Sequence, residues 1–279
     1  MPPARSRLTV KFWGTRGSIP VPGRSTLVYG GNTSCVEVTL GRHSLILDAG
    51  TGIRPLGQNL LKKNIRGPIR ILIGHAHMDH IGGLPFFGPA LAKKNRLEIY
   101  GPHGLKRSLD RLFPFSVLSA KKPVKEVRPG PLRLSPFRVD CRRLNHPGGS
   151  LGFRIETPSG RRIVYISDHE PVASHRHDRR GPSDRSILRW MRRPDLLIMD
   201  AQYFEEEYPG RRSWGHSPFS YTVRLALEGG VRHLVLYHHD PAHFDAVLRR
   251  KLEMSRKIIR DLGGKMRCSL AREGARIVI

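Results

Sequence analysis

The chain has 279 residues, of which 38% are hydrophobic and 26% charged, a composition that argues against disorder and suits one large α/β domain or two small ones. No apolar stretch reaches the ~18 residues of a membrane span, and Met1 to Thr9 lack the apolar run of a secretory signal, so we expect a soluble, cytoplasmic protein. Lysine and arginine total 49 against 23 aspartate and glutamate, and the resulting net charge of +26 would attract polyanions, although the excess is spread along the chain and composition alone can explain much of it.

Short runs rich in valine, isoleucine and leucine, bounded by glycine, proline or asparagine, predict strands in both halves of the chain. In chain order they are Leu8–Trp13, Cys35–Leu40, Ser44–Asp48, Ile69–Ile73, Leu97–Tyr100, Gly152–Glu156, Arg162–Ser167, Leu196–Asp200, His233–Tyr237 and Arg276–Ile279. Helix-like patterns lie between and after them. These are Ile53–Lys63, Leu105–Phe113, Ser183–Trp190, Pro218–Glu228 and Ala242–Leu262.

This order of strands and helices predicts an α/β layered sandwich, with sheets inside and helices outside. No linker or repeat divides the sequence, so we expect a single domain over residues 1–279. The stretch Phe113–Pro136 is rich in proline and lysine and is expected to be a solvated loop. Its basic residues are Lys121, Lys122, Lys125 and Arg128.

Three cysteines, Cys35, Cys141 and Cys268, lie far apart and form no CxxC pair. Their spacing and odd number argue against a disulfide framework or a cysteine-based zinc site. We therefore expect buried free thiols.

The strongest chemical signal is the run Ile73-Gly-His-Ala-His-Met-Asp-His80, directly after an apolar strand. His75 and His77 lie two apart in extended backbone and therefore project to the same side. Asp79 and His80 follow where the chain turns into two glycines. Packing these four groups together without a metal would leave polar atoms competing for partners. The run therefore predicts a site for zinc or a similar divalent ion.

The segment His75-Ala-His-Met-Asp-His80 resembles the H-x-H-x-D-H signature of the metallo-β-lactamase superfamily, and the resemblance continues along nearly the whole chain. Leu45-Ile-Leu-Asp-Ala-Gly50 looks like the family's Asp-x-Gly segment after a strand. Three later residues match the third-ligand histidine, the bridging aspartate and the last ligand. They are His146, Asp168 and His238. The resemblance implies an α/β, four-layer αββα sandwich of the metallo-β-lactamase type.

The same resemblance implies two divalent metal ions, with zinc expected and Mn²⁺ or Fe²⁺ as alternatives. The first ion would take His75, His77 and His146. The second would take Asp79, His80 and His238, while Asp168 and a hydroxide bridge both. The adjacent His239 leaves the last ligand open by one residue. Two ions with two carboxylates and a hydroxide keep a net charge of about +1, which suits an anionic phosphate.

Two further segments, Asp200-Ala-Gln-Tyr203 and Trp214-Gly-His-Ser217, resemble the ribonuclease Z-like branch, which includes cyclic phosphodiesterases. This resemblance implies that His216 contacts the phosphate and protonates the leaving oxygen, and that Asp200 orients the ring of His216. A structural alternative is that His216 merely lies beside an N-cap, with Ser217 capping the next helix.

The resemblance extends to residues around these segments. Asp48 is a candidate to orient a ligand histidine or a plain turn residue. Arg16, in a glycine-rich segment that also resembles this branch, is not predicted to bind phosphate.

The reaction that these roles predict is in-line attack on phosphorus by the metal-bridging hydroxide, with His216 as general acid. We expect Asp79, His216 and Asp200 to be required for catalysis. One departure from the bacterial ribonuclease Z pattern narrows the substrate. The interval from His146 to Asp168 holds only two short predicted strands and a turn, with no room for a tRNA-clamping arm.

The sequence therefore favours a phosphodiesterase acting on small or cyclic phosphodiesters of the cyclic nucleotide type. A ribonuclease Z-like nuclease on RNA or single-stranded DNA stays open, because the positive charge favours a polyanion. A third alternative is a non-catalytic nucleic-acid-binding protein. We expect a phosphodiester substrate, no membrane partner and no nucleotide cofactor, and leave nucleic acid and a homodimer open as partners.

Overall fold

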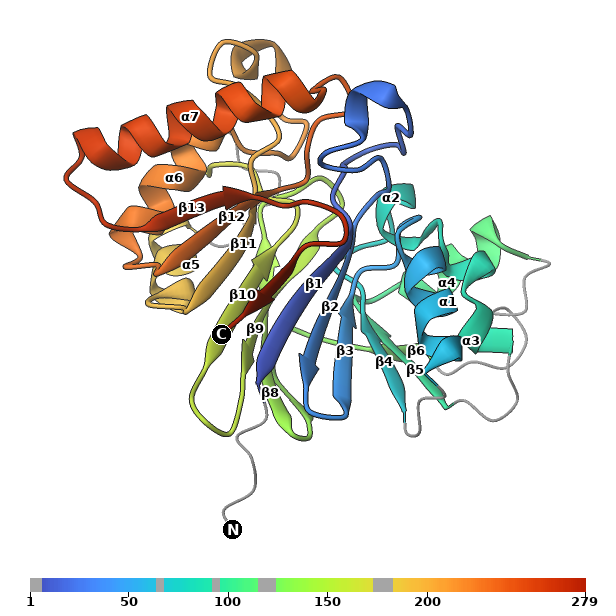
Figure 1. Cartoon of the computed structure of the whole chain (residues 1–279). Coiled ribbons are helices and arrows are strands. Elements are labelled where there is room, and N and C mark those ends of the chain that lie inside the picture. The colour runs from blue at the N-terminus through green and yellow to red at the C-terminus, as the bar shows by residue number, and fades with distance from the viewer. Residues whose placement is uncertain (1–6, 64–67, 92–95, 115–123, 173–182) are drawn as a thin grey trace. The chain divides into compact units, whose positions relative to one another are not determined.

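A computed structural model describes residues 7–63, 68–91, 96–114, 124–172 and 183–279 (Figure 1). Backbone contacts divide the chain into two compact units. Unit 1 comprises Met1–Arg24, Gly30–Arg128 and Arg272–Ile279, and unit 2 comprises Ser25–Tyr29 and Pro129–Ala271. Each unit contains one seven-stranded sheet. The chain is thus an α/β protein with two mixed sheets flanked by helices.

The sheet of unit 1 has the order β14-β1-β2-β3-β4-β5-β6. Its strands are β1 Leu8–Gly14, β2 Cys35–Leu40, β3 His43–Leu47, β4 Ile69–Leu72, β5 Leu97–Gly101, β6 Val124–Glu126 and β14 Arg276–Val278. Pairing is antiparallel from β14 to β3 and parallel from β3 to β6. Side chains of β1 alternate between buried and partly buried positions, as expected for a strand with one face on a core.

The helices of unit 1 are α1 Ile53–Lys62, α2 Met78–Ile81, α3 Gly88–Leu91 and α4 Leu105–Leu112, with short 3₁₀ turns at Arg24–Thr26, where the chain passes into unit 2, and Leu84–Phe86. Helix α1 buries Ile53, Leu56 and Leu60 in an apolar cluster with the strands of this sheet. Gly57 lies where α1 meets the start of α3, and a Cβ atom there would come 2.9 Å from Phe87 and Pro89. Glycine therefore permits this close helix approach.

The sheet of unit 2 has the order β13-β12-β11-β10-β9-β8-β7. Its strands are β7 Gly130–Leu134, β8 Phe137–Leu144, β9 Ser150–Glu156, β10 Arg162–Ile166, β11 Leu196–Asp200, β12 His233–Tyr237 and β13 Arg267–Leu270. Pairing is antiparallel from β7 to β10 and parallel from β10 to β13. Every residue of β11 and β12 is buried, which is why these strands read as continuous apolar runs.

The helices of unit 2 are α5 Asp184–Met191, α6 Phe219–Glu228 and α7 Asp245–Asp261, with a 3₁₀ turn at Tyr208–Arg211. Figure 1 shows α6 and the long α7 lying along the β11–β13 side of this sheet. Their apolar faces join the strands in one cluster that includes Phe219, Val223, Leu248 and Ile259. Of the described helices, none combines the length and the apolar character needed to cross a bilayer.

Strand direction brings chemically active side chains to one edge within each sheet. Parallel strands place their carboxyl ends at a common edge. In unit 1, Asp48 follows β3 and His75 lies just beyond the parallel β4. In unit 2, Asp168 lies just beyond β10, Asp200 ends β11, and His238 follows β12. Strand β8 runs in the direction of β10, because both pair antiparallel with β9, so His146 reaches the same edge.

The predicted strands and helices are present, with ends that differ by up to three residues. Four strands were not predicted, namely β6, β7, β8 and β13. The loop predicted over Phe113–Pro136 is wrong where β6 and β7 lie. Lys121 and Lys122 lie outside the described residues, and Arg128 is exposed in the connection after β6. Proline and lysine misled the prediction because short edge strands tolerate both.

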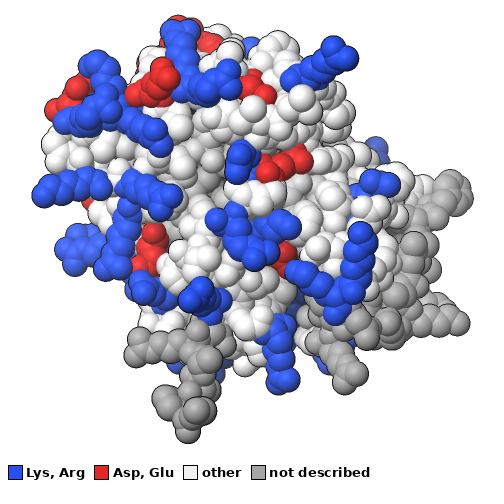
Figure 2. Space-filling model, viewed as in Figure 1, with Lys and Arg blue, Asp and Glu red and all other residues white. Residues whose placement is uncertain are grey.

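The three cysteines are free and buried, as predicted. Burial raises the pKa of the Cys141 and Cys268 thiols to about 12 and that of Cys35 well above its usual range. These thiols are therefore inert. Figure 2 shows lysine and arginine side chains spread over the viewed face with few acidic side chains between them, as the net charge of +26 requires.

Candidate metal centre

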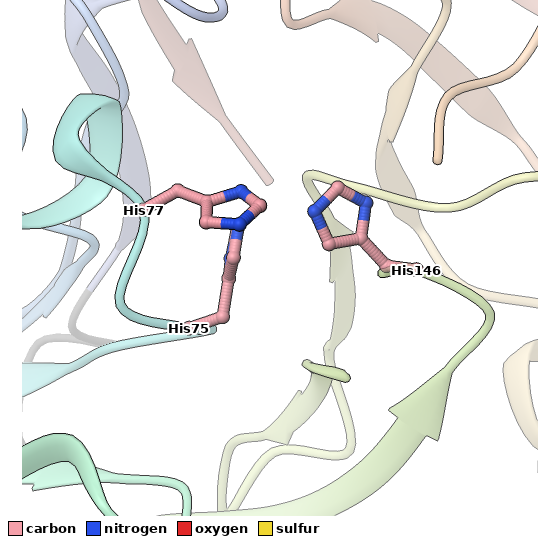
Figure 3. A group of neighbouring side chains, drawn as sticks. All are labelled: His75, His77 and His146. Atoms are coloured by element: carbon pink, nitrogen blue, oxygen red, sulfur yellow. The ribbon is translucent and has the colours of Figure 1, made fainter. Parts of the chain in front are cut away.

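The three predicted ligand histidines of unit 1 lie close together. They are His75, His77 and His80. The buried strand β4 ends at Leu72, and the loop beyond it carries His75 and His77 before α2 begins at Met78. The ring centroids of His75 and His77 lie 4.4 Å apart, and those of His75 and His80 lie 4.3 Å apart. Figure 3 shows the rings of His75 and His77 side by side in this loop. The single turn of α2 brings His80 back to the two earlier histidines.

Asp48 fixes the orientation of His80. Its Oδ2 lies 2.8 Å from Nδ1 of His80, and its Oδ1 accepts a hydrogen bond of 2.7 Å from the backbone N–H of Gly74. All three groups are buried. With Nδ1 bound to this carboxylate, Nε2 is the nitrogen that His80 can offer to a metal. That Nε2 lies 3.2 Å from Oδ2 of Asp79.

In unit 2, His146 is positioned by the segment that precedes α6. Its Nδ1 lies 2.9 Å from the carbonyl oxygen of Gly215, to which an N–H at that position donates. Gly215 has φ of +93°, and a Cβ atom there would lie 2.3 Å from Nδ1 of His146. Only glycine fits both the backbone conformation and the space. Nε2 of His146 is then directed to Asp168, 3.8 Å from its Oδ2. Figure 3 also draws His146, just beyond β8.

Three histidines of unit 2 lie close to Asp168. Its Oδ2 lies 3.5 Å from Nε2 of His238 and 3.8 Å from Nδ1 of His216. The ligand atoms of His146, Asp168 and His216 all lie within 4.8 Å of one another. These side chains are buried, with Asp168 1% and His238 0% exposed. Such a concentration of imidazole and carboxylate groups is the donor set that zinc and similar divalent ions prefer.

The structure separates the roles of His238 and His239. Nδ1 of His238 lies 2.9 Å from Oε1 of Gln202, which accepts its proton, so that Nε2 faces Asp168. His239 turns the other way, with Nε2 2.9 Å from the carbonyl oxygen of Ala271. His238, with φ of +58°, is therefore the histidine of this pair that reaches the cluster.

His216 and Asp200 form a second buried pair beside this cluster. Nδ1 of His216 lies 2.9 Å from Oδ2 of Asp200, and the His216 ring stacks on that of His238 with centroids 4.7 Å apart. Asp200 is held in turn, because its Oδ2 accepts from the N–H of His169 and its Oδ1 from that of Gln202. His216 itself is buried, with 8% of its surface exposed.

The capping alternative for Ser217 is wrong. The N-cap of α6 is Pro218, which makes no side-chain capping bond. The hydroxyl of Ser217 instead donates to the carbonyl oxygen of His169, 2.5 Å away. Arg16 is fully buried in unit 1, where its Nε donates to the carbonyl oxygen of Gly30, so its role is structural.

Two residues of the site were not predicted. Gln202 fixes the ring of His238, and its own amide is held because Nε2 donates to Oδ2 of Asp240 at 3.2 Å. Glu170, 0% exposed, accepts from the backbone N–H groups of Ser213 and Gly215 and so fixes the segment before His216. Gln202 lies two residues after Asp200, which ends a strand, and this position is a usable sequence signal. Glu170 offers none, because the partners of its carboxylate lie 38 to 45 residues away in the sequence.

The family of the chain follows from a family model described as the Beta-lactamase superfamily domain, which matches residues 43–239. The chain belongs to this superfamily, and membership implies divalent metal ions. The matched range includes every histidine and aspartate predicted above to bind a metal.

Three individual relatives share a quarter or less of their residues with this chain. The chain is 25% identical to a ribonuclease Z of Methanosarcina mazei over 296 residues, covering 86% of this chain and 90% of that protein. Among solved structures, it resembles the metallo-beta-lactamase fold protein YhfI from Bacillus subtilis, with a TM-score of 0.73 and 20% identity over 98% of this chain and 100% of the other. It also resembles a diphosphatase from the PhnP family, with a TM-score of 0.70 and 19% identity over 98% and 97% of the two chains. These likenesses confirm the predicted α/β metallo-β-lactamase fold.

Proposed function

We propose that this chain is a metal-dependent hydrolase that cleaves phosphodiester bonds. The observation that carries the proposal is the pair of His216 and Asp200, in which Nδ1 of the histidine lies 2.9 Å from Oδ2 of the aspartate. The His216 ring also stacks on His238 and lies beside Asp168. A histidine held by a carboxylate next to a metal-binding cluster can donate a proton where negative charge develops. The ribonuclease Z relatives and the likeness to a PhnP-family diphosphatase favour phosphorus as the reacting centre.

The proposed centre would hold two divalent ions, and we propose that residues 1–279 are a single metallo-β-lactamase domain. His75, His77 and His146 would bind one ion, and Asp79, His80 and His238 the other, with Asp168 shared. Support comes from three hydrogen bonds. Nδ1 is engaged by Asp48 in His80, by Gly215 in His146 and by Gln202 in His238, which leaves Nε2 of each ring for a metal. This nitrogen-rich set with few carboxylates suits zinc, with manganese or iron(II) as alternatives.

When bound, two divalent ions supply an activated water and neutralise charge on the phosphate. The residues of this chain perform the rest. His216 donates a proton from Nε2 to the departing oxygen, because its Nδ1 is committed to Asp200. Asp200 holds the ring in place and stabilises the cationic form. The buried walls around Asp168 and His238 exclude bulk water, which strengthens each electrostatic contact.

We propose small or cyclic phosphodiesters as the substrate class. Between His146 and Asp168 the chain forms only β9 and β10, an antiparallel pair, with the short connections around them. No tRNA-clamping arm is inserted there. The alternative is a ribonuclease Z-like nuclease, which the named relatives and the charge of +26 favour. A cytoplasmic location and the oligomeric state stay predictions.

The test is hydrolysis by the zinc-loaded full chain of bis-p-nitrophenyl phosphate, cyclic nucleotides, a tRNA precursor and a β-lactam. We expect turnover of phosphodiesters and none of the β-lactam. His216→Ala should lower kcat by about 100-fold or more. The matched control is His103→Ala, because the His103 side chain is 87% exposed and pairs with the surface residue Glu126. Equal activity of the two variants would contradict the proposal.

Ionic strength separates the two substrate classes. Turnover of a long polyanion should fall steeply between about 50 and 200 mM salt, because released counterions drive its binding. Turnover of a cyclic nucleotide should change little. A steep fall for the tRNA precursor, together with its faster cleavage, would favour the nuclease alternative.

A further inference from the structure

An exposed tryptophan lies two residues before His216. Trp214 is 58% exposed, whereas tryptophan side chains in folded proteins are usually well buried. Two residues of chain span at most about 7 Å. The Cα atoms of Trp214 and His216 therefore lie within about 7 Å of each other, a separation comparable with the size of one nucleotide.

The segment that carries Trp214 is rigidly held. On either side of it, the N–H groups of Ser213 and Gly215 donate to the carboxylate of Glu170, at 2.8 and 3.0 Å. The hydroxyl of Tyr208 donates to the same carboxylate at 2.9 Å. Glu170 is fully buried, so these charge-assisted bonds are strong. The backbone on both sides of Trp214 is thus held in place.

Arg211 connects this indole to the site. Its guanidinium carbon lies 5.2 Å from the ring centroid of Trp214 and 5.2 Å from that of Tyr203. Tyr203 is buried, and its ring meets that of His216 edge-on, with centroids 6.0 Å apart. Arg211 also lies 3.5 Å from Oδ2 of Asp240, which limits its movement. The planar groups of Trp214, Arg211 and Tyr203 therefore form one series that ends at His216.

A rigid, exposed indole with a guanidinium beside it has the chemistry of a stacking surface for a nucleobase. Each base has a π-face, and stacking on an aromatic side chain is tolerant of base identity. Arginine adds a planar cation that also stacks on bases and binds phosphate oxygens. Burial in a core does not account for Trp214, because more than half of the side chain stays in water.

We propose that Trp214 and Arg211 form a subsite that stacks a nucleobase of the substrate next to the phosphodiester that His216 meets. The inference rests on the proposed function and narrows it, since the substrate class becomes nucleotide phosphodiesters rather than lipid or sugar diesters. Trp214 would act as a binding residue and not in proton transfer.

The first test measures binding and requires no turnover. Adenosine 5′-monophosphate should quench the tryptophan emission of the metal-loaded wild-type chain, while ribose 5-phosphate, which has the same phosphate and no base, should not. Trp214→Phe should lose this quenching, because the indole on which the base is proposed to stack is then absent. Quenching that persists in Trp214→Phe, or that ribose 5-phosphate reproduces, would overturn the proposal. This result stands even if the chain hydrolyses nothing.

The second test measures hydrolysis with matched substrates. Trp214→Ala should lower kcat/KM by about 10- to 100-fold for a dinucleotide, mainly through KM, and by less than about twofold for the same diester without bases. Trp214→Phe should retain most of the activity, because a phenyl ring still stacks. Equal losses on both substrates would overturn the proposal. Repeating the comparison of wild type and Trp214→Ala with a cyclic nucleotide shows whether the stacked base belongs to a cyclic monomer or to a chain end. A loss that depends on the base, with either substrate, supports the subsite.

Discussion

Nδ1 of His216 lies 2.9 Å from Oδ2 of Asp200, and both side chains are buried in unit 2. Asp200 ends β11, and His216 precedes α6, so the pair depends on the packing of two segments sixteen residues apart. The carboxylate accepts the Nδ1 proton and leaves Nε2 as the nitrogen that can exchange a proton with substrate. Their contact is the feature of this chain that most directly indicates acid–base chemistry.

Replacing Asp200 with asparagine tests this contact. We expect kcat to fall about 10- to 100-fold with little change in KM, because the ring loses its orientation and the support for its cationic form. The pH–rate profile should change shape together with kcat, which a purely structural role would not produce. A variant with wild-type kcat and an unchanged profile would show that Asp200 does not act on His216.

Asp48 should govern metal affinity in unit 1. In Asp48→Asn the amide can accept from Gly74 or from His80, but not from both, so His80 loses its fixed tautomer. We expect the ion that His80 is proposed to bind to be held about 10- to 100-fold more weakly, as measured by competition with a chelator. Because Asp48 has φ of +59°, which asparagine tolerates, the fold should be retained. Unchanged metal affinity would refute this role.

Gly215 should tolerate no side chain. Alanine there would adopt an unfavourable φ of +93° and place its Cβ 2.3 Å from Nδ1 of His146. We expect a loss of stability of about 1–2 kcal/mol from the backbone alone, together with lower metal content because His146 is displaced. Thermal unfolding and metal analysis of the same sample measure both effects. Gly210→Ala is the matched control, since nothing lies within 4 Å of a Cβ atom at Gly210.

Lys251 is a buried cation that supports the end of β11. Its Nζ donates to the carbonyl oxygens of Ala201 and Gln202, both at 2.8 Å, and lies 3.1 Å from Nδ1 of His243. Lys251→Met would leave two buried carbonyls without this donor, at a cost of about 2–4 kcal/mol in the free energy of unfolding. The control is Lys257→Met on the same helix, because the Lys257 side chain is 68% exposed. It should change the free energy of unfolding by less than about 0.5 kcal/mol. Urea denaturation measures both, and similar values would contradict the role of Lys251.

His233 should make stability depend on pH. Burial, with a smaller effect of Arg267, lowers its pKa to about 4 from an ordinary value of 6.5. The unfolded chain therefore takes up this proton first, so the stabilisation is complete above about pH 6.5 and is lost as pH falls toward 4. Between pH 7 and 4.5, the free energy of unfolding of His233→Gln should fall by roughly 1–2 kcal/mol less than that of the wild type, after allowance for solvent screening. Urea denaturation of both proteins at the two pH values measures this difference. Identical losses of stability in the variant and the wild type would refute this role of His233.

The sequence predicted much of this arrangement because local patterns report local structure. The apolar runs before Asp48, Asp168, Asp200 and His238 read directly as buried strands. The close spacing of His75, His77 and His80 predicted their grouping, and the structure places those rings together.

Other features depend on contacts that no local pattern reports. Strand β8 was missed although Phe137, Val139 and Cys141 alternate with exposed or partly buried residues, because Pro136 and several arginines obscured the period. The choice between His238 and His239 required the positions of Gln202 and Ala271, which lie just beyond the ends of β11 and β13. Glu170 acquires its role only when the segment around Gly215 folds back on it.

The most direct test of the central claim is a titration of the metal-free chain with zinc, following hydrolysis of bis-p-nitrophenyl phosphate against the metal bound per chain. The account predicts no hydrolysis without metal, a rate that rises with occupancy and a plateau near two ions per chain. Hydrolysis that is independent of added metal, or full occupancy with no hydrolysis of this or any other phosphodiester tested, would contradict it.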